Sequence, residues 1–557
     1  MPHFDVECLD CGHRMPYHPM QDTCPQCGGG WMEARYDLES LRHDFVQRLQ
    51  ARPFNLWRYH EVLPVHTPAP PWSMGDGGTP LIRAVNLGLM LGNENIFIKD
   101  ERQGPTNSFK DRQAALGISA LKEAGITEAV LASTGNVAIA FSAYAARAGI
   151  KLWAFLTSLV PPEKMREVAL YGTQVIKVTA SYDQAKKMAA EFARQRNLYY
   201  ERGSRSIPSV EGMKTIAYEL AEQLTQWQGA PANGIPWRAP DWYIQAVSGG
   251  LGPQGIAKGF QELYAMGLTD KIPAMAHIQT AGCAPMTSSW QADRAEPITV
   301  DSPHTHIATL ATGAPGRTYT LLYQHAKQHG GTFVSVSDEE AYRAIHIAAK
   351  MEGLSVEPAT AVAFAGLFNL VRQGVIRPTD TVIINCTGHT MPIERTVLGE
   401  GWARNLVVSR HTESVPAGGP EEGLLSALNR LTVDRYPRVA IVDDTPEARR
   451  LIRRILQSQG DFTILEAENG RQAIELARRE KPDLMILDLM MPEVDGFGVL
   501  DALKEDSETA EIPVIVVTAK TLTPAEKRQL RGRVHSLMQK GEFMSDDLSE
   551  EIRGLIE

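Results

Sequence analysis

The sequence has no long apolar run and no long basic run, and each absence excludes a class of function. No apolar stretch approaches the ~18 to 20 residues that a membrane-spanning helix needs. The first ten residues, MPHFDVECLD, lack the basic and apolar parts of a secretory signal. The net charge is −10, the pI is near 5.9, and no Lys and Arg cluster is long enough to follow a nucleic-acid backbone. We therefore predict a cytoplasmic protein that binds neither membrane nor nucleic acid.

Cysteine is also scarce, with six in 557 residues, and four of the six lie close together. Cys8, Cys11, Cys24 and Cys27 form a C-x2-C-x12-C-x2-C pattern. Four thiolates at this spacing can surround a zinc ion tetrahedrally and leave no open position for a catalytic water. The alternatives are reduced turns without metal, or two disulfides, which cytosolic reduction disfavours. The pattern predicts a structural zinc ribbon over residues 1–36.

The rest of the chain is too long for one core, since domains average ~150 residues. Residues 35–50 predict one acidic-capped helix after the ribbon. Short apolar runs then alternate with helical segments, which predicts an α/β domain over residues 37–408, with a parallel sheet covered on both faces. Its expected strands are NIFIKD, EAVLAS, KLWAFLT, QVIKVT, WYIQAVS, AMAHIQT and TVIINCTG. A segment rich in Pro, Gly, Ser and charge predicts a linker at 409–435.

The same alternation restarts on a smaller scale over residues 436–557. Its first helix carries an apolar stripe at i, i+3, i+4, i+7 and i+8 from Ala448 to Leu456. Five strand candidates are separated by helices: RVAIVDD, FTILEAE, LMILDL, IPVIVVTA and HSLMQK. Five β/α units in about 120 residues predict a flavodoxin-like (βα)5 domain.

Three expected strands of the larger domain end in polar turns that contain glycine. These turns are TGN at 134–136, SGGLGP at 248–253 and TGH at 387–389. Ligands of open parallel sheets bind at the carboxyl ends of the strands, so we expect the three turns to share one rim. The second turn has the features of a phosphate cradle, because glycines let backbone amides converge and the next helix points its positive end at the anion.

Lys110, in the stretch GPTNSFKDRQAALG, would enter the same rim from the start of a helix, with its stem packed by Phe109. Partial burial disfavours the ammonium form and frees the amine to form a Schiff base with a carbonyl. A lone lysine is more commonly a solvated helix residue, but the neighbouring motifs favour the reactive role. A lysine, a phosphate cradle and a polar group for a pyridine nitrogen are the three grips that pyridoxal phosphate requires.

Taken in order, the motifs of residues 1 to about 405 resemble the pyridoxal-phosphate enzymes of fold type II, and among them the threonine synthases. The matching motifs are GGTPL (77–81), NSFKDR (107–112), STGN (133–136), AYAARAG (143–149), VSGGLGP (247–253), GCAP (282–285), VEPATA (356–361) and TGH (387–389). The N-terminal ribbon that runs into RYDL belongs to the same resemblance, which also suggests a homodimer.

The resemblance implies a role for each matching residue. Lys110 would carry the cofactor and then move protons at the α and β carbons of the substrate. Asn136 would hydrogen-bond the ring hydroxyl of the cofactor, and Thr387 would meet the pyridine nitrogen; both could instead be ordinary turn residues. The implied anion-binding residues are Ser248, Gly249, Gly250, Leu251 and Gly252 for the cofactor phosphate, and Ser133 and Thr134 for the substrate carboxylate.

The implied reaction converts O-phosphohomoserine and water into threonine and phosphate. Two segments depart from the family pattern. TGH continues as TMPI where GLKDP is typical, and STGN continues as VAIAF where a threonine or serine is usual. Because both changes touch the walls of the site, another lyase of this fold stays open, such as a cysteate synthase or an amino-acid dehydratase. A non-catalytic amino-acid sensor of a two-component system is the alternative from another class.

The smaller domain carries its own cluster of charged residues at strand ends. Asp443 and Asp444 end the first strand and Asp488 ends the third. Three carboxylates on one rim repel each other unless a divalent cation such as Mg²⁺ lies among them. One carboxylate could then act as a nucleophile toward a phosphoryl group, with its oxygens steadied by Thr518 and Lys540. The alternative is an acidic rim without metal.

This pattern resembles the receiver domain of response regulators. The resemblance implies that Asp488 accepts the phosphoryl group from a sensor histidine kinase or a small phosphodonor. Asp443 and Asp444 would help to hold Mg²⁺, Thr518 would be the switch hydroxyl, and Lys540 would be its charge partner. Leu537 and Gly541 replace an aromatic residue and a proline that are usual near this lysine, so we expect no aromatic switch. The output would be the attached enzyme or a partner protein.

Overall fold

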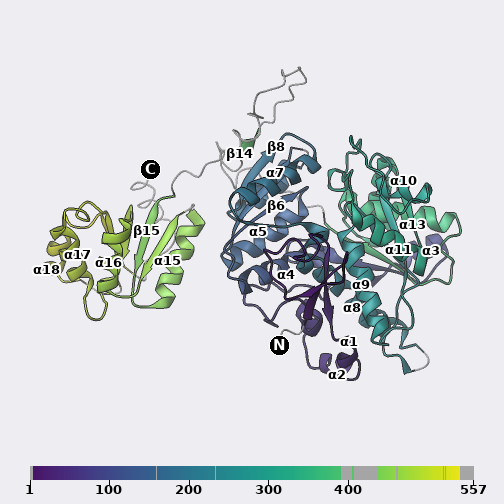
Figure 1. The fold of residues 1–557 in the computed structure, drawn as a ribbon, viewed down its shortest axis with the longest axis horizontal. Helices are drawn as coiled ribbons and strands as arrows, with labels where there is room; N and C mark the ends of the chain where they lie inside the picture. Colours follow the sequence, from purple (N-terminus) through teal and green to yellow (C-terminus); the bar gives the residue numbers. More distant parts are fainter. Residues whose placement is uncertain are drawn as a thin grey trace, which may run out of the picture. The chain divides into compact units, whose positions relative to one another are not determined.

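The chain forms two compact units, Met1–Leu424 and Leu425–Glu557, in a computed structural model (Figure 1). The described residues are 4–158, 160–231, 234–389, 404–406, 436–459, 462–518, 520 and 522–539. The expected linker at 409–435 and Lys540 lie outside these ranges. Among the described residues, no helix is both long enough and apolar enough to cross a membrane.

The larger unit begins with a small antiparallel sheet in the order β2-β1-β3. Its strands are β1 (Phe4–Cys8), β2 (Arg14–Met15) and β3 (Met32–Tyr36). Side chains of β1 alternate between buried and more exposed, so the strand places one face against the core. The single helix predicted at 35–50 is wrong: α1 (Leu38–Leu41) and α2 (Phe45–Leu49) are separate, because Asp44 leaves the helical conformation with φ −131° and ψ 2°.

The body of the larger unit contains two sheets covered by helices, as the resemblance to fold type II pyridoxal-phosphate enzymes implies, whereas the alternation of strands and helices alone predicts one parallel sheet. The first has six strands, of which only β4 runs antiparallel, and the second has five parallel strands. The first sheet consists, in order, of β12 (Gly331–Val336), β11 (Ala274–Thr280), β10 (Trp242–Ala246), β13 (Val382–Cys386), β5 (Ile96–Asp100) and β4 (Leu81–Arg83). The second consists of β14 (Arg404–Leu406), β8 (Gln174–Val178), β7 (Lys151–Thr157), β6 (Glu128–Ser133) and β9 (Tyr199–Tyr200). All seven strands predicted for this region are confirmed.

Helices cover both sheets, and two of them carry the functional loops. The long helix α8 (Ile207–Gln228) packs against α4 (Lys110–Glu123) and lies beside α9 (Leu251–Ala265) (Figure 1). The other helices of the body are η1 (Leu56–Val62), α3 (Val85–Leu91), η2 (Glu101–Gln103), α5 (Asn136–Ala148), α6 (Pro162–Leu170), α7 (Tyr182–Gln195), η3 (Gly203–Arg205), α10 (Pro285–Gln291), η5 (Ala308–Leu310), α11 (Arg317–His329), α12 (Asp338–Glu352) and α13 (Pro358–Arg372). Since α4 and α9 flank one helix, their first residues can act on one ligand.

The smaller unit is a five-stranded parallel sheet in the order β16-β15-β17-β18-β19. This 2-1-3-4-5 order is the flavodoxin-like arrangement, which confirms the predicted fold. The strands are β15 (Arg438–Val442), β16 (Thr463–Ala467), β17 (Leu484–Leu487), β18 (Val514–Thr518) and β19 (Ser536–Gln539), and the helices are α15 (Pro446–Gln459), α16 (Gly470–Glu480), α17 (Gly496–Glu505) and α18 (Pro524–Leu530). Ile452 and Leu456 of the predicted apolar stripe are buried.

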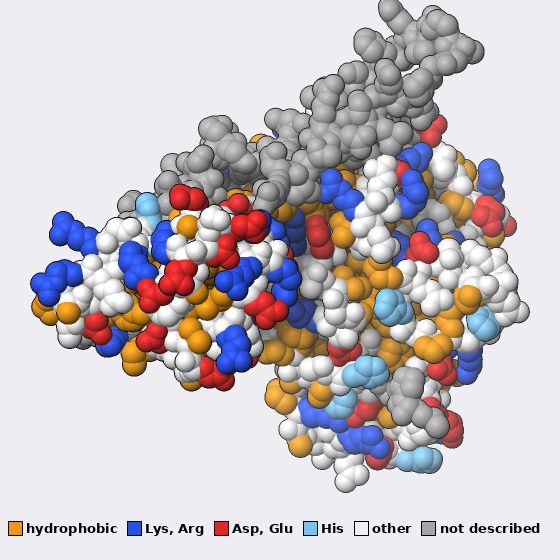
Figure 2. Space-filling model, turned by 60° about the vertical axis from the view of Figure 1, so that its left-hand side comes forward, with side chains coloured by type: hydrophobic (Ala, Val, Ile, Leu, Met, Phe, Trp, Pro, Cys, Tyr) orange, Lys and Arg blue, Asp and Glu red, His pale blue; other side chains and the backbone are white. Residues whose placement is uncertain are grey.

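Charged side chains of both signs are interspersed on the described surface shown in Figure 2. Lysines and arginines there stand beside aspartates and glutamates. Ion pairs of the larger unit include Arg194 with Glu191 and Lys186 with Asp183.

Candidate active site and phosphoacceptor site

Lys110 is the first residue of α4 and is half-buried. Its Nζ lies 4.1 Å from the centre of the Phe109 ring, which is the packing that the sequence predicts. Burial lowers the pKa of Lys110 to about 8, although the negative charge of Glu357 opposes this shift. A lysine with this pKa has far more neutral amine near neutral pH than an ordinary lysine, and the neutral amine is the form that attacks a carbonyl.

The loop before Lys110 is fastened to the turn that follows β13. The amide of Phe109 donates to the carbonyl of Thr387 at 3.0 Å, and the amide of His389 donates to the carbonyl of Asn107, also at 3.0 Å. These backbone bonds bring the lysine and Thr387 together, although 277 positions separate them in the chain (387 − 110).

Thr387 is buried, and its hydroxyl contacts Thr360, a residue for which the sequence motifs predict no role. The hydroxyl oxygens of Thr360 and Thr387 lie 2.8 Å apart, and the amide of Gly388 donates to Thr360 Oγ1 at 3.0 Å. Thr360 lies in the VEPATA motif but could be found only through this contact. The pair places two neutral hydroxyls next to each other at the start of the turn.

The turn after β6 belongs to the five-stranded sheet, so the expectation that all three turns share one rim of one sheet is wrong. It nevertheless reaches the turn after β13 through Glu357: Asn136, the first residue of α5, donates from Nδ2 to both carboxylate oxygens of Glu357 at 2.9 Å, and the amide of Glu357 donates to the carbonyl of Gly388 at 3.1 Å. Ser133 Oγ accepts hydrogen bonds from the amides of Gly135 and Ala138 at 3.0 and 3.2 Å, so it also caps the start of its own helix. Thr134 lies between them, half-buried.

The predicted phosphate cradle is built as expected from small residues at the start of α9. Gly250 has φ +86°, and a Cβ there would lie 2.7 Å from Thr318 Cγ2. A Cβ on Gly252 would lie 3.0 Å from the Phe109 ring and would also clash with Gln245, whereas Gly249 faces open space. Leu251 opens the helix. Backbone amides at a helix start with room for a ligand fit a phosphate group.

Ser248, the first residue of the cradle, is steadied by a second hydroxyl. Its Oγ lies 2.6 Å from Thr312 Oγ1, and Thr312 is buried. Together, the half-buried amine, the glycine cradle and the neutral hydroxyl of Thr387 fit the three groups of pyridoxal phosphate: its aldehyde, its phosphate and its pyridine nitrogen.

A buried ion network that sequence reasoning missed lies beneath the site. Arg112, 1% exposed, donates to Glu101 at 2.7 Å and to Glu219 at 2.6 and 2.7 Å. Lys99 Nζ donates to Glu219 Oε2 at 2.7 Å. Burial alone would raise the pKa of Glu219, but Arg112 and Lys99 hold it lowered, at about 2. The network ties α4 to α8 and to β5, which fixes the helix that starts with Lys110.

The four N-terminal cysteines come together as the spacing predicts. The Sγ atoms of Cys8 and Cys27 lie 3.6 Å apart and those of Cys11 and Cys24 lie 3.7 Å apart. A tetrahedral site with Zn–S bonds of ~2.3 Å has sulfurs ~3.8 Å apart, whereas a disulfide needs ~2.05 Å. The cluster therefore fits zinc and does not contain disulfides.

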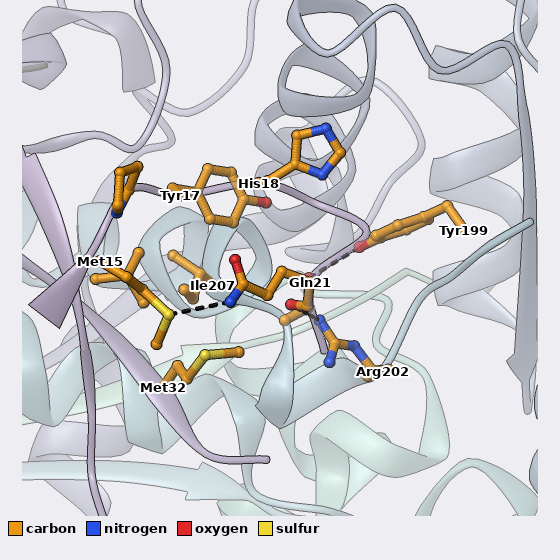
Figure 3. Close-up of a pocket in the computed structure, with 11 residues that line it drawn as sticks. Met15, Tyr17, His18, Gln21, Met32, Tyr199, Arg202 and Ile207 are labelled. Atoms are coloured by element: carbon orange, nitrogen blue, oxygen red, sulfur yellow. Dashed lines mark hydrogen bonds between the residues drawn. The ribbon is translucent and has the colours of Figure 1, made fainter. Parts of the chain in front are cut away.

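The ribbon packs closely against the body, as Figure 3 shows for one pocket at their junction. The pocket is lined by Met15, Tyr17 and Met32 of the ribbon and by residues that include Tyr199 and Ile207 of the body. It encloses only about 10 Å³, room for one water at most, so it is a packing contact and no ligand site.

The acidic cluster of the smaller unit also forms. Oxygen atoms of Asp443, Asp444 and Asp488 lie within 4.8 Å of one another at the ends of β15 and β17. Thr518, at the end of β18, is buried. A set of carboxylate oxygens at this spacing suits Mg²⁺, which keeps several waters.

Two family models match parts of this chain. Residues 72–388 match the family model "Pyridoxal-phosphate dependent enzyme", and residues 439–553 match "Response regulator receiver domain". The chain belongs to the family of pyridoxal-phosphate-dependent enzymes and carries a receiver domain that follows the enzyme region in the sequence.

Its relatives within that family are more specific. The threonine synthase of Methanocaldococcus jannaschii is 33% identical over 384 residues, which cover 69% of this chain and 91% of that protein. The threonine synthase of Methanosarcina acetivorans is 31% identical over 396 residues, which cover 71% of this chain and 94% of that protein. The chain is thus a threonine-synthase-like enzyme of the pyridoxal-phosphate family, fused to a receiver domain.

Proposed function

We propose that this enzyme converts O-phosphohomoserine and water into threonine and phosphate, under the control of its receiver domain. The surroundings of Lys110 carry the proposal: its amine has a lowered pKa, and the preceding Phe109 contacts both Thr387 and the glycine cradle. The domains we propose are a zinc ribbon at 1–36, a catalytic domain at 37–408, a linker at 409–435 and a receiver at 436–557. The identity to threonine synthases over about nine-tenths of their length supports the substrate.

Pyridoxal phosphate, when bound, supplies an electron sink for charge at the α and β carbons of an amino acid. Lys110 binds the aldehyde carbon and moves protons at these carbons. The amides of residues 249–252 and the Ser248 hydroxyl bind the cofactor phosphate, and Asn136 donates to the ring oxygen. Thr387 meets the pyridine nitrogen with a hydroxyl, which leaves this nitrogen unprotonated and so moderates the sink. Ser133 and Thr134 bind the substrate carboxylate.

Phosphate release from O-phosphohomoserine tests the substrate. The purified, cofactor-loaded protein should release phosphate and threonine in equal amounts, and Lys110→Ala should abolish the release. Lys122→Ala, at the far end of the same helix, is the matched control and should leave the rate unchanged. Release of neither product by the unmodified protein would refute the substrate.

The altered segment after Asn136 supports a second candidate, another lyase of the same fold. Val137 follows Asn136 directly, where the family pattern has a hydroxyl-bearing residue, so one polar contact to a substrate is missing. O-phosphoserine with sulfite tests a cysteate synthase, and threonine or serine alone tests a dehydratase. Binding of amino acids without turnover of any of them would favour the sensor.

For the receiver domain, we propose that Asp488 accepts the phosphoryl group with Mg²⁺ held by Asp443, Asp444 and Asp488 itself. A sensor histidine kinase or a small phosphodonor would supply the group, and Thr518 and Lys540 would bind its oxygens. Acetyl phosphate should label the unmodified protein in the presence of Mg²⁺ and should not label Asp488→Ala. A change in the rate of phosphate release on labelling, absent in Asp488→Ala, would support control; equal rates would refute it.

A further inference from the structure

A second lysine, Lys164, lies at the predicted cofactor site, although it belongs to none of the sequence motifs described above. Lys164 lies on α6, and its side chain is only 18% exposed. Its Nζ lies 2.6 Å from Asn136 Oδ1 and 3.1 Å from Glu357 Oε2. The three side chains come from α6, from the start of α5 and from the residue before α13, so they join the two sheets of the catalytic unit at the cofactor site.

The turn of the STGN motif is shaped to let this lysine pass. Gly135 has φ +138°, and a Cβ there would lie 3.1 Å from Lys164 Cδ. The stem of Lys164 therefore lies across the glycine, and the ammonium reaches the far side of the turn. A side chain at position 135 would displace it.

The chemistry of the three groups permits only one orientation of the Asn136 amide. An ammonium group can only donate hydrogen bonds and a carboxylate can only accept them. The amide oxygen must therefore face Lys164, and the NH2 group must face Glu357. With its oxygen held by the Lys164 ammonium, Asn136 keeps only its NH2 group as a partner for the ring oxygen of pyridoxal phosphate, and this group also donates to Glu357.

The ammonium also balances a charge that acts on Lys110. Glu357 is 5% exposed, and its carboxylate opposes the lowering of the Lys110 pKa. An unbalanced carboxylate in a buried site would favour the charged form of any nearby amine. Lys164 reduces that effect by pairing with Glu357.

We propose that Lys164 is a positioning residue of the cofactor site, which fixes the donor face of Asn136 toward the cofactor and neutralises Glu357. The proposal depends on the cofactor family and not on the identity of the substrate. Lys164 acts through Asn136 and Glu357 and has no catalytic step of its own.

The test compares Lys164→Met and Lys164→Arg with the unmodified protein. Lys186→Met is the matched control, because Lys186 is also partly buried and ion-paired with an acidic residue, Asp183, on a helix covering the same sheet. One readout is the dissociation constant of pyridoxal phosphate for the apo protein, measured by fluorescence. The other is the pKa of the bound chromophore, obtained by titrating its visible absorption.

Loss of the ammonium should weaken cofactor binding about tenfold or more, because it removes a charge-assisted hydrogen bond and leaves a buried carboxylate unpaired. The chromophore pKa should rise in Lys164→Met, Lys164→Arg should recover most of both properties, and Lys186→Met should change neither. Unchanged cofactor affinity and unchanged titration in Lys164→Met would overturn the proposal. A rise in substrate KM alone would assign Lys164 to the substrate and would also overturn it.

A double-mutant cycle separates positioning from general damage to the fold. In the Asn136→Ala background, Lys164→Met should weaken cofactor binding much less than in the unmodified background, because the amide to be oriented is gone. Lys164→Met with Glu357→Gln should return the chromophore pKa toward its original value. Additive effects on affinity and no return of the pKa would overturn the proposal, even if the variants melt at lower temperature.

Discussion

Replacement of Arg112 by methionine should destabilise the catalytic unit more than any change of a surface arginine. Arg112 is 1% exposed and makes six side-chain hydrogen bonds, of 2.6 to 3.1 Å, to Glu101, Glu219, Thr79 and Thr215. Methionine fills a similar length but offers no donor, so two buried carboxylates lose their partner at once. Breaking a buried ion pair from one side costs about 3 to 5 kcal/mol.

The expected loss of stability depends on the hydrogen-bond donors that Glu219 and Glu101 keep when Arg112 is replaced. Glu219 keeps Lys99 at 2.7 Å, and Glu101 keeps the hydroxyl of Thr79 at 2.6 Å. Glu219 also keeps the amide of Gly78 at 2.8 Å. Each carboxylate therefore retains at least one donor, which places the loss of stability at the lower end, about 3 kcal/mol. Arg112→Lys should lose less, because it keeps the charge but cannot form the two-pronged contact of a guanidinium.

Urea unfolding followed by tryptophan fluorescence measures this loss in the apo protein, so that cofactor binding does not contribute. Arg194→Met is the control: Arg194 pairs with Glu191 on the solvent-exposed face of α7, and its loss should leave the urea midpoint unchanged within error. A loss below about 1 kcal/mol for Arg112→Met would refute the view that this network fixes α4. A loss as large for Arg112→Lys would show that the guanidinium geometry, and not its charge, is what matters.

Three further outcomes are expected. Burial lowers the pKa of His277 to about 3 and of His325 to about 4, so the two histidines take up protons in the unfolded chain at a higher pH than in the folded one. The free energy of unfolding should therefore fall by about 1.4 kcal/mol per pH unit for each histidine as the pH drops from ~6.5 to ~4. In urea titrations, His277→Met should about halve this slope. Removal of zinc by a chelator should release one metal ion per chain and lower the melting temperature of the catalytic unit. Cys24→Ala should lower the melting temperature in the same way without chelator. Purified protein that contains no metal would contradict the zinc site. Gly250→Ala should weaken cofactor binding at least tenfold, because φ +86° strains alanine and its Cβ would press on Thr318; an unchanged cofactor affinity would contradict the proposed cradle.

The sequence was most informative where one short segment determines both conformation and chemistry. Apolar runs of five to seven residues became strands in both units, because residues buried on both faces of a parallel sheet must be apolar along their length. The same alternation could not assign strands to sheets. β6 and β10 are both short, largely buried strands followed by a turn that contains glycine, yet β6 pairs with β7 and β9 while β10 pairs with β11 and β13. This choice depends on packing between distant helices.

The residues of the site show the same difference between local and distant contacts. Lys110 could be recognised because its surroundings are largely local: Phe109 packs its stem, and the turn before it sets the start of the helix. The orientation of Asn136 depends on Lys164, 28 positions away, and on Glu357, 221 positions away. A lysine on a polar helix such as α6 has the same sequence signature whether it faces solvent or a carboxylate, so only the fold distinguishes the two. For this reason, groups that orient a cofactor's ligands are harder to find from sequence than the group that binds the cofactor, even when both lie in one site.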